Sequence, residues 1–212
     1  DARTPWKMRY CALQNVTINL PRIAYQANHD DEELFRLLRE RLVMVVRAHQ
    51  QKRTFIEALL SLKSEGPLAL LAMDADGEPY LRLHRVNYLV GVLGLNEMVQ
   101  YHTGKQLHES EDAFRFGLKV IAFLNLEARR LAKENNIRLV IEQTPAESTA
   151  FRLAKLDLEL YPEQAMRVVK GDIQSGAVYY TNSTYLNISA PIDPVERVYL
   201  EGKFHDLIEA GA

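Results

Sequence analysis

Short apolar runs with the character of buried strands alternate along this chain with longer segments of helical periodicity. The strand-like runs cover residues 15–20, 88–95 and 137–141, where β-branched and other apolar side chains dominate. Between them, apolar side chains recur at helical spacing over about residues 30–63 and again over residues 110–135. Strands that alternate with helices in this way favour an α/β fold over an α+β fold. Because no flexible linker interrupts the pattern, we expect a single domain.

Weaker signals predict further elements. Residues 68–73 and 80–83 flank the run Asp-Ala-Asp-Gly, which indicates two extended pieces around a turn. Residues 178–186 have the pattern of another strand, and a final helix is expected from about Val195. Pro21 is expected to end the first strand, since proline cannot donate to a sheet ladder.

The composition is that of an ordinary globular protein and disfavours several classes of function. Of the 212 residues, 47% are hydrophobic and 25% are charged, which is enough for one domain with a core. The net charge of -2 gives no reason to expect nucleic acid or an anionic membrane surface as a partner. No apolar run approaches the roughly 18 residues of a membrane span. The single cysteine, Cys11, excludes an intramolecular disulfide, so we expect a cytoplasmic protein.

The turn after the third strand-like run is the most suggestive feature for function. Thr144 and Pro145 separate this run from a segment of good helix formers, and proline suits the opening turn of a helix. Ser148 and Thr149 add hydroxyls beside backbone N–H groups that a helix leaves free. Free N–H groups and the positive end of the helix dipole favour an anion such as phosphate. The alternative is an ordinary capped helix, which is the more common arrangement.

Two polar segments stand where α/β folds place ligand contacts, and each has a structural alternative. Asn96 and Glu97 follow the run at residues 88–95, whose glycines indicate close approach of another backbone or a ligand. The same two residues fit a helix start in which Asn96 is the N-cap. Residues 179–183 are rich in hydrogen-bonding side chains, and they either line a polar pocket or form an exposed edge strand.

Spacing alone defines no catalytic or metal centre among the cysteine and the histidines. Cys11 stands beside Arg9, whose charge would lower the pKa of a thiol, although a lone cysteine is more often a small buried hydrophobe. His102 and His108 are six residues apart, and no Cys-x-x-Cys or His-x-x-x-His pattern occurs. We therefore assign no metal.

In five segments, taken in order, the chain resembles the anaerobic (class III) ribonucleoside-triphosphate reductases, which are glycyl-radical enzymes. These segments are N-V-T-I-N-L-P-R-I-A at residues 15–24, G-V-L-G-L-N-E-M at 91–98, Q-T-P-A-E-S-T-A-F-R-L-A-K at 143–155, Y-P at 161–162 and Y-Y-T-N-S at 179–183. The T-P-A-E-S-T and Y-Y-T-N-S segments are quite specific. The resemblance spans nearly all of residues 1–212.

The resemblance implies a fold and a reaction. The fold is part of a ten-stranded α/β barrel of the glycyl-radical enzyme and ribonucleotide reductase type, built from two antiparallel half-barrels. Inside it, a finger loop carries a cysteine that becomes a thiyl radical. The reaction removes the 2′-hydroxyl of a ribonucleotide and makes a deoxyribonucleotide. The barrel holds the radical against the ribose in a dry, fixed geometry.

The resemblance also implies roles for individual residues. The family's substrate-phosphate loop is matched by Thr144, Ala146, Glu147, Ser148 and Thr149, so the expected anion is a ribonucleoside triphosphate.

Further positions follow from the same resemblance. Asn96 and Glu97 are expected near the substrate pocket, with Tyr180 and Asn182 on a neighbouring barrel strand. Cys11 stands at the approach to the strand after the finger loop. It takes either the thiyl position or the place of a residue that handles the reductant.

Several parts of the family have no counterpart in this sequence. They are the regulatory cone, the first half of the barrel, the cysteine cluster that binds zinc and the loop with the radical glycine. We therefore expect no cofactor in this chain itself, and we expect the chain alone to be inactive. The implied partners are a ribonucleoside triphosphate, the remaining reductase segments, the radical-SAM activase and a second copy of the chain. The alternative is a non-catalytic remnant whose open barrel edge captures a partner.

Overall fold

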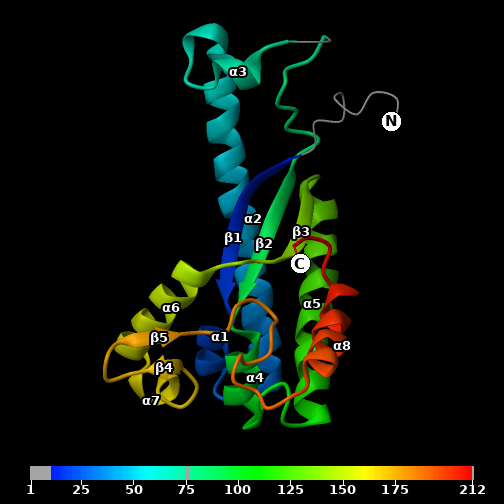
Figure 1. The fold of residues 1–212 in the computed structure, drawn as a ribbon. Coiled ribbons are helices and arrows are strands. Elements are labelled where there is room, and N and C mark those ends of the chain that lie inside the picture. The colour runs from blue at the N-terminus through cyan, green and yellow to red at the C-terminus, as the bar shows by residue number, and fades with distance from the viewer. Residues whose placement is uncertain (1–10, 75–76, 212) are drawn as a thin grey trace.

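A parallel sheet of three strands forms the centre of the molecule. The computed structural model describes residues 11–74 and 77–211. The strands are β1 (Ala12–Asn19), β2 (Asn87–Leu93) and β3 (Arg138–Gln143), and β2 lies in the middle (Figure 1). The register places Thr17 opposite Gly91 and Gly91 opposite Glu142, so these residues form one row across the sheet.

Two long helices cover one face of this sheet. They are α2 (Asp31–Ser61) and α5 (Glu111–Asn135), and they pack against each other and against the strands. Asp30 and Ser110 cap their N-termini by accepting hydrogen bonds from Glu33 N and Ala113 N. Alternate strand residues, such as Val90 and Ile141, are buried against the apolar stripes of the helices.

A helix follows each strand at the same edge of the sheet. α1 (Leu20–Ala27) follows β1 directly, α4 (Leu95–Thr103) follows β2 after Gly94, and α6 (Glu147–Leu160) follows β3 after a three-residue turn. Because the strands are parallel, three helix N-termini meet at the carboxyl edge of the sheet (Figure 1).

A side lobe continues from α6. It contains α7 (Pro162–Ala165) and an antiparallel hairpin of β4 (Lys170–Asp172) and β5 (Ala177–Tyr179). Its apolar cluster is separate from the main core and consists of Leu93, Ala146, Ala150, Ala154, Val178 and Tyr180.

The remaining elements lie at opposite ends of the sheet. α2 extends beyond the amino edge, where η2 (Lys63–Glu65) and α3 (Ala69–Ala72) follow it (Figure 1). α8 (Pro194–His205) packs through Phe204 on Phe114 of α5. After α8, Ala210 forms a parallel bridge with Glu142, so the chain runs beside β3 there.

The predicted α/β alternation is confirmed, but three local predictions are wrong. Residues 68–73 are not extended, because Ala69–Ala72 form one helical turn beside the end of α2. Residues 80–83 form no strand, and the nearest pairing is an isolated bridge between Asp74 and Pro79. The strand predicted at residues 178–186 ends at Tyr179, in the hairpin and not in the main sheet.

Pro21 follows the end of β1, as predicted, but it belongs to a helix that the sequence did not reveal. The strand ends at Asn19, whose side chain caps α1, and Pro21 stands in the first turn. Proline is tolerated at this position because the first N–H groups of a helix have no intrahelical partner.

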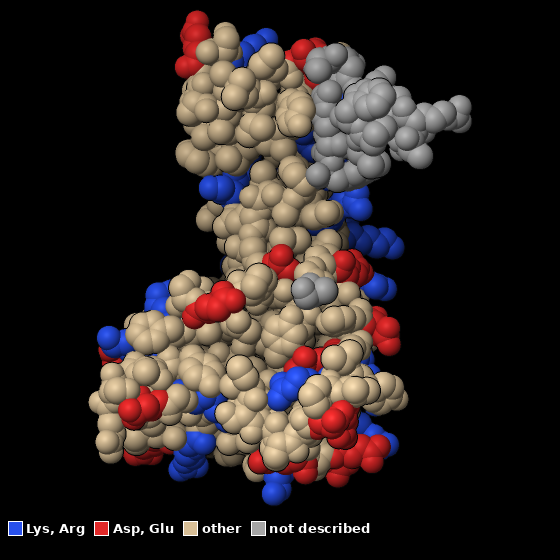
Figure 2. Space-filling view, viewed as in Figure 1, with Lys and Arg blue, Asp and Glu red and all other residues tan. Residues whose placement is uncertain are grey.

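Charged side chains of both signs are mixed over the lower part of the molecule on the face drawn in Figure 2. This face shows no large patch of one sign. Within the described residues, no helix combines the length and apolar character needed to cross a membrane.

Candidate functional site

A polar cluster interrupts the sheet near its carboxyl edge, on the face that α2 and α5 leave uncovered. Asn15 Nδ2 donates to Glu142 Oε2 and, at 3.0 Å, to Thr144 Oγ1. The N–H of Gly91 donates to Asn15 Oδ1 at 3.0 Å. These bonds join β1, β2 and the end of β3 through side chains that are distant in the sequence.

Gly91 makes room for this cluster. A Cβ on Gly91 would lie 2.7 Å from both Asn15 Oδ1 and Thr17 Oγ1, and it would also meet Thr144 Oγ1. A close approach at a strand glycine was expected from another backbone or a ligand, whereas at Gly91 it is made by side chains. Asn15, Thr17 and Glu142 were not among the predicted site residues. For Asn15 and Thr17 the signal was the alternation of polar and apolar residues along β1. Glu142 stands at the corresponding polar position near the end of β3.

The first turn of α6 follows this cluster immediately. Thr144 is 8% exposed, and Ala146 is the N-cap residue, without a side-chain capping bond. Glu147 and Ser148 are exposed and Thr149 is half-buried. The alternative of an ordinary side-chain cap is therefore wrong at this helix. Pro145 precedes the N-cap instead of standing inside the first turn.

Asn96 and Glu97 lie at the start of α4 and are fully buried. Glu97 Oε2 accepts a hydrogen bond from the N–H of Thr181 at 2.9 Å, and Oε1 accepts one from the Thr181 hydroxyl at 2.7 Å. Asn96 Nδ2 donates to Glu97 Oε1 at 3.0 Å, and Lys170 Nζ lies 3.9 Å from the same oxygen. Glu97 therefore holds Thr181 against α4, and Asn96 in turn donates to the Glu97 carboxylate. The N-cap alternative for Asn96 is wrong, since Gly94 occupies that position with φ of 75°.

Residues 180–183 leave the hairpin and run toward α4. Gly94 N donates to the carbonyl of Thr181 and Leu95 N to that of Ser183, at 3.0 and 3.1 Å. Tyr180 is 1% exposed and Asn182 is half-buried. The alternative of an exposed edge strand is therefore wrong for this segment.

A cavity of about 440 Å³ opens between α6, this segment and α8. Glu147 and Ala150 line it from α6, and Arg197 and Glu201 line it from α8. The remaining lining comes from Tyr179, Tyr180, Thr181, Asn182, Tyr185, Leu186 and Ile188. Asn182 Oδ1 is buried and has no hydrogen-bond partner in the described part of the chain. A mostly apolar cavity with a few polar groups is typical of a site for an organic ligand.

Cys11 lies just before β1, at the amino edge of the sheet. Burial raises the pKa of its thiol, which is opposite to the effect expected from Arg9. Arg9 lies outside the described residues. Because Cys11 precedes β1 and α6 follows the carboxyl end of β3, Cys11 and the first turn of α6 lie at opposite edges of the sheet.

The histidines predicted to hold no metal have other contacts. His102 Nε2 lies 2.7 Å from Asp31 Oδ1, and the ring stacks on Phe116. Burial lowers the pKa of His108. Within the described ranges, no three His, Cys, Asp or Glu side chains gather in a way that would hold a metal ion.

The parallel sheet, its covering helices and its polar carboxyl edge define part of an α/β barrel. The family described as "Anaerobic ribonucleoside-triphosphate reductase" matches residues 4–212. The chain therefore belongs to the anaerobic ribonucleoside-triphosphate reductase family.

The curated relatives that this chain matches are also named anaerobic ribonucleoside-triphosphate reductases. The anaerobic ribonucleoside-triphosphate reductase of Salmonella typhimurium is 26% identical over 203 residues, which cover 92% of this chain and 28% of the relative. The protein of the same name from Enterobacteria phage T4 is 23% identical over 206 residues, which cover 92% of this chain and 31% of the relative. This chain thus spans about a third or less of the length of these relatives.

Solved structures show the same fold. The anaerobic ribonucleotide reductase from Thermotoga maritima with citrate in the active site matches with a TM-score of 0.76 at 23% identity, over 95% of this chain and 34% of that chain. The same enzyme in complex with dATP and CTP matches with a TM-score of 0.75 at 23% identity, and the match covers 95% of this chain and 31% of that chain. The predicted fold, part of the α/β barrel of these reductases, is confirmed.

Proposed function

We propose that this chain is part of the catalytic barrel of an anaerobic ribonucleoside-triphosphate reductase and binds the substrate at the carboxyl edge of its sheet. The reaction replaces the 2′-hydroxyl of the ribose by hydrogen and makes a deoxyribonucleotide. The observation that carries the proposal is the first turn of α6. It has no side-chain cap, and it stands between the polar cluster and the 440 Å³ cavity.

The triphosphate is assigned to the first turn of α6. The N–H groups of Glu147, Ser148 and Thr149 have no intrahelical acceptor, and the helix dipole adds positive potential there. The hydroxyls of Ser148 and Thr149 supply two more donors. The carboxylate of Glu147 is exposed, so solvent screens its repulsion of the phosphates.

The nucleoside is assigned to the space on either side of this turn. The cavity lined by Tyr185 and Asn182 offers apolar surface and an amide to a base. Asn15, Glu142 and Thr144 offer hydrogen-bonding groups to the ribose. Glu97, to which Asn96 donates, holds Thr181 beside this contact.

Cys11 fits the handling of the reductant better than contact with the ribose. It precedes β1, whose eight residues span roughly 26 Å between the two edges of the sheet. The proposed site lies at the other edge.

The proposed reaction also needs a glycyl radical. The glycyl radical of the reductase supplies the unpaired electron, and a radical-SAM activase generates it. We expect the chain to act in the cytoplasm with the remaining reductase segments and a second copy of itself. The structural zinc of the family is likewise assigned to those segments.

Titration calorimetry with CTP, cytidine and inorganic tripolyphosphate tests the binding site. The Ser148→Asp variant places a carboxylate in the first turn of α6, which the helix dipole favours but a triphosphate does not. We expect affinity for CTP and tripolyphosphate to fall at least tenfold, with no loss of thermal stability. The control is Ser175→Asp, which adds the same charge at an exposed turn of the hairpin. Equal affinity of the Ser148→Asp variant and the wild type for CTP would contradict the assignment.

Turnover tests the reaction. The chain is mixed under anoxia with the complementary reductase segments, the activase and a ribonucleoside triphosphate. Deoxynucleotide formation that requires this chain supports the proposal, and its absence with every piece present refutes it.

A second candidate function is that of an interaction module. Within the described residues β1 pairs only with β2, so its outer edge is unpaired. Leu70, Ile188 and Val195 are more than three-quarters exposed. Unpaired edges and exposed apolar side chains favour association. CTP binding, measured beside sedimentation velocity, distinguishes the two functions. A chain that self-associates and binds no CTP favours the interaction module, and a chain that binds CTP favours the reductase function.

A further inference from the structure

We infer that Asp157 is a positioning residue that sets the direction of α6, and with it the first turn of that helix, relative to the sheet. The functional part of this inference rests on the proposed phosphate site. Its geometric part stands on the contacts of Asp157 alone.

The carboxylate of Asp157 is fully buried and accepts hydrogen bonds from three side chains. Arg22 Nε donates to Oδ1 at 2.7 Å, and Arg22 Nη2 lies 2.6 Å from the same oxygen. Asn19 Nδ2 and the hydroxyl of Tyr180 donate to Oδ2 at 2.9 and 2.8 Å. Both oxygens are thus used, which a buried carboxylate requires.

These bonds connect elements that belong to different parts of the chain. Asn19 is the last residue of β1 and the N-cap of α1, and Arg22 stands in the first turn of α1. Tyr180 begins the segment that runs toward α4, and its hydroxyl lies 3.0 Å from that of Tyr25 on α1. Asp157 therefore joins α6 to the end of the first strand.

Burial raises the pKa of both Tyr180 and Tyr25 above the ordinary value of a phenol. Both hydroxyls therefore keep their protons near neutral pH. The hydroxyl of Tyr180 therefore remains a donor to Asp157.

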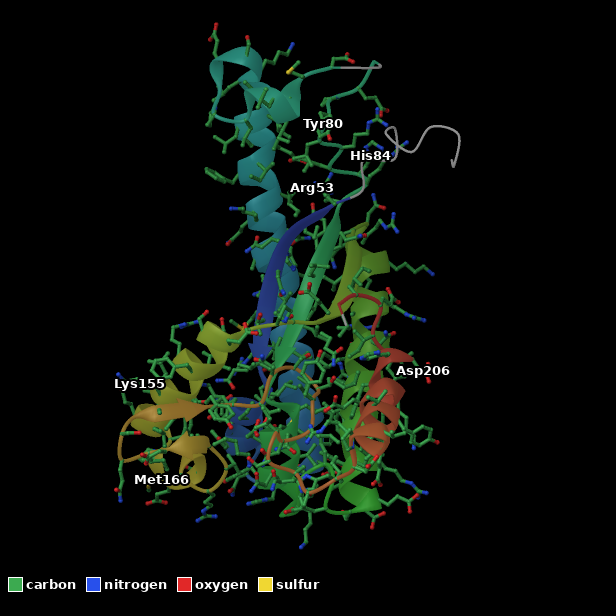
Figure 3. All side chains as sticks on the ribbon, in the orientation of Figure 1. Arg53, Tyr80, His84, Lys155, Met166 and Asp206 are labelled. Atoms are coloured by element: carbon green, nitrogen blue, oxygen red, sulfur yellow. The ribbon has the colours of Figure 1, made fainter. Side chains whose placement is uncertain are left out.

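Apolar packing also holds α6, but it is less directional than the bonds to Asp157. The buried side of α6 carries Ala146, Ala150 and Ala154, which share the small cluster with Leu93 of β2, and the partly buried Leu153 and Leu158 pack beside them. Contacts between small apolar groups are non-directional, whereas four polar contacts to one carboxylate fix an angle. Lys155, on the exposed side of α6, lies in this lobe well apart from the sheet and its covering helices (Figure 3).

A small change in the direction of α6 at Asp157 displaces the first turn of the helix by a large distance. Asp157 lies ten residues after Glu147, which is about 15 Å along a helix. A tilt of about 10° at Asp157 would move the first turn by roughly 2.6 Å over this length. Hydrogen bonds to phosphate tolerate only a few tenths of an ångström, so such a tilt would take the N–H groups out of register with the ligand.

The test compares Asp157→Asn with Glu159→Gln, which makes the same change of charge at an exposed position of the same helix. Tyr180→Phe is a milder variant that removes one donor and keeps the ring. Spin labels at Lys155→Cys and Lys133→Cys, in a Cys11→Ser background, report the distance from α6 to α5. We expect a broadened or shifted distance distribution for Asp157→Asn and Tyr180→Phe, and no change for Glu159→Gln.

Binding gives the second readout. We expect Asp157→Asn to weaken CTP and tripolyphosphate binding at least fivefold while cytidine binding changes less than twofold. If Asp157 had a merely structural role, the substitution would weaken the binding of CTP, tripolyphosphate and cytidine equally. An unchanged distance distribution in folded Asp157→Asn and Tyr180→Phe overturns the inference. If the wild type binds neither CTP nor tripolyphosphate, the proposed function fails, while the distance measurement still decides the geometric part.

Discussion

Thr17 and Gly91 lie opposite each other in the parallel pair β1–β2, and the hydroxyl of Thr17 fills space that a side chain at position 91 would need. A methyl group on Gly91 would approach Thr17 Oγ1 and Asn15 Oδ1 to 2.7 Å. Real Cβ atoms do not approach polar atoms this closely, so either the strands or the polar cluster must move. The pair thus links the packing of the sheet to the candidate site.

Gly91→Ala is therefore expected to destabilise the protein by about 1–3 kcal/mol, the usual cost of overpacking. Urea unfolding measures this change. Gly202→Ala is the matched control, because its Cβ would meet no atom within 4 Å in α8. Alanine should stabilise that helix by about 0.5–1 kcal/mol. Equal stability of the two variants would show that the space at Gly91 is not restricted.

Glu97→Gln is expected to cost about 1.5–3 kcal/mol, since hydrogen bonds to a buried charged group are lost. The amide cannot accept with both of its atoms, and Lys170 loses its carboxylate partner. Faster amide hydrogen exchange at Thr181 is the specific sign, because that N–H donates to Glu97. The exposed Glu196→Gln should change stability by less than about 0.5 kcal/mol. Unchanged exchange at Thr181 would be inconsistent with the role given to Glu97.

His49 is expected to make the protein less stable in acid. Burial lowers the pKa of His49 in the folded protein, while its Nε2 lies 3.0 Å from the carbonyl of Leu89. The unfolded chain, with a histidine pKa of about 6.5, then takes up the proton first. The contribution of His49 to the free energy of unfolding is therefore fully present above this pH. It falls as the pH drops toward the pKa of His49 in the folded protein, by at most about 1.4 kcal/mol per pH unit.

Urea unfolding between pH 7.5 and pH 5 measures this dependence. His49→Gln keeps a donor for Leu89 and removes the titration, so its stability should fall less on acidification. Some dependence will remain, because burial also lowers the pKa of His108. His205→Gln, at an exposed position, should retain the full dependence. A His49→Gln variant with the same dependence as the wild type contradicts this account.

The main elements were predictable because their signals are local. Long amphipathic helices with Asp30 and Ser110 as caps, and β-branched runs between them, are recognisable without tertiary information. α1 was missed because eight residues give too short a periodic pattern, and Pro21 was interpreted only as the end of a strand. The strand at residues 178–186 failed for a tertiary reason, since the N–H of Thr181 donates to Glu97 instead of to a neighbouring strand.

The candidate site was predictable only in part. The turn before α6 was identified because its residues are consecutive in the sequence. Asn15 and Glu142 meet only through the parallel register of three strands, which no local pattern specifies. Asp157 looked like any helical carboxylate, and only folding shows that Arg22 and Tyr180 reach it.

The most direct test of a triphosphate site at α6 is a titration of the ¹⁵N-labelled protein with CTP, followed by NMR of the backbone amides. Binding at the first turn predicts that the resonances of Glu147, Ser148 and Thr149 shift most. Tripolyphosphate should reproduce these shifts, and cytidine should not. If CTP binds while these three amides stay unshifted, the triphosphate site lies elsewhere and the central claim is wrong.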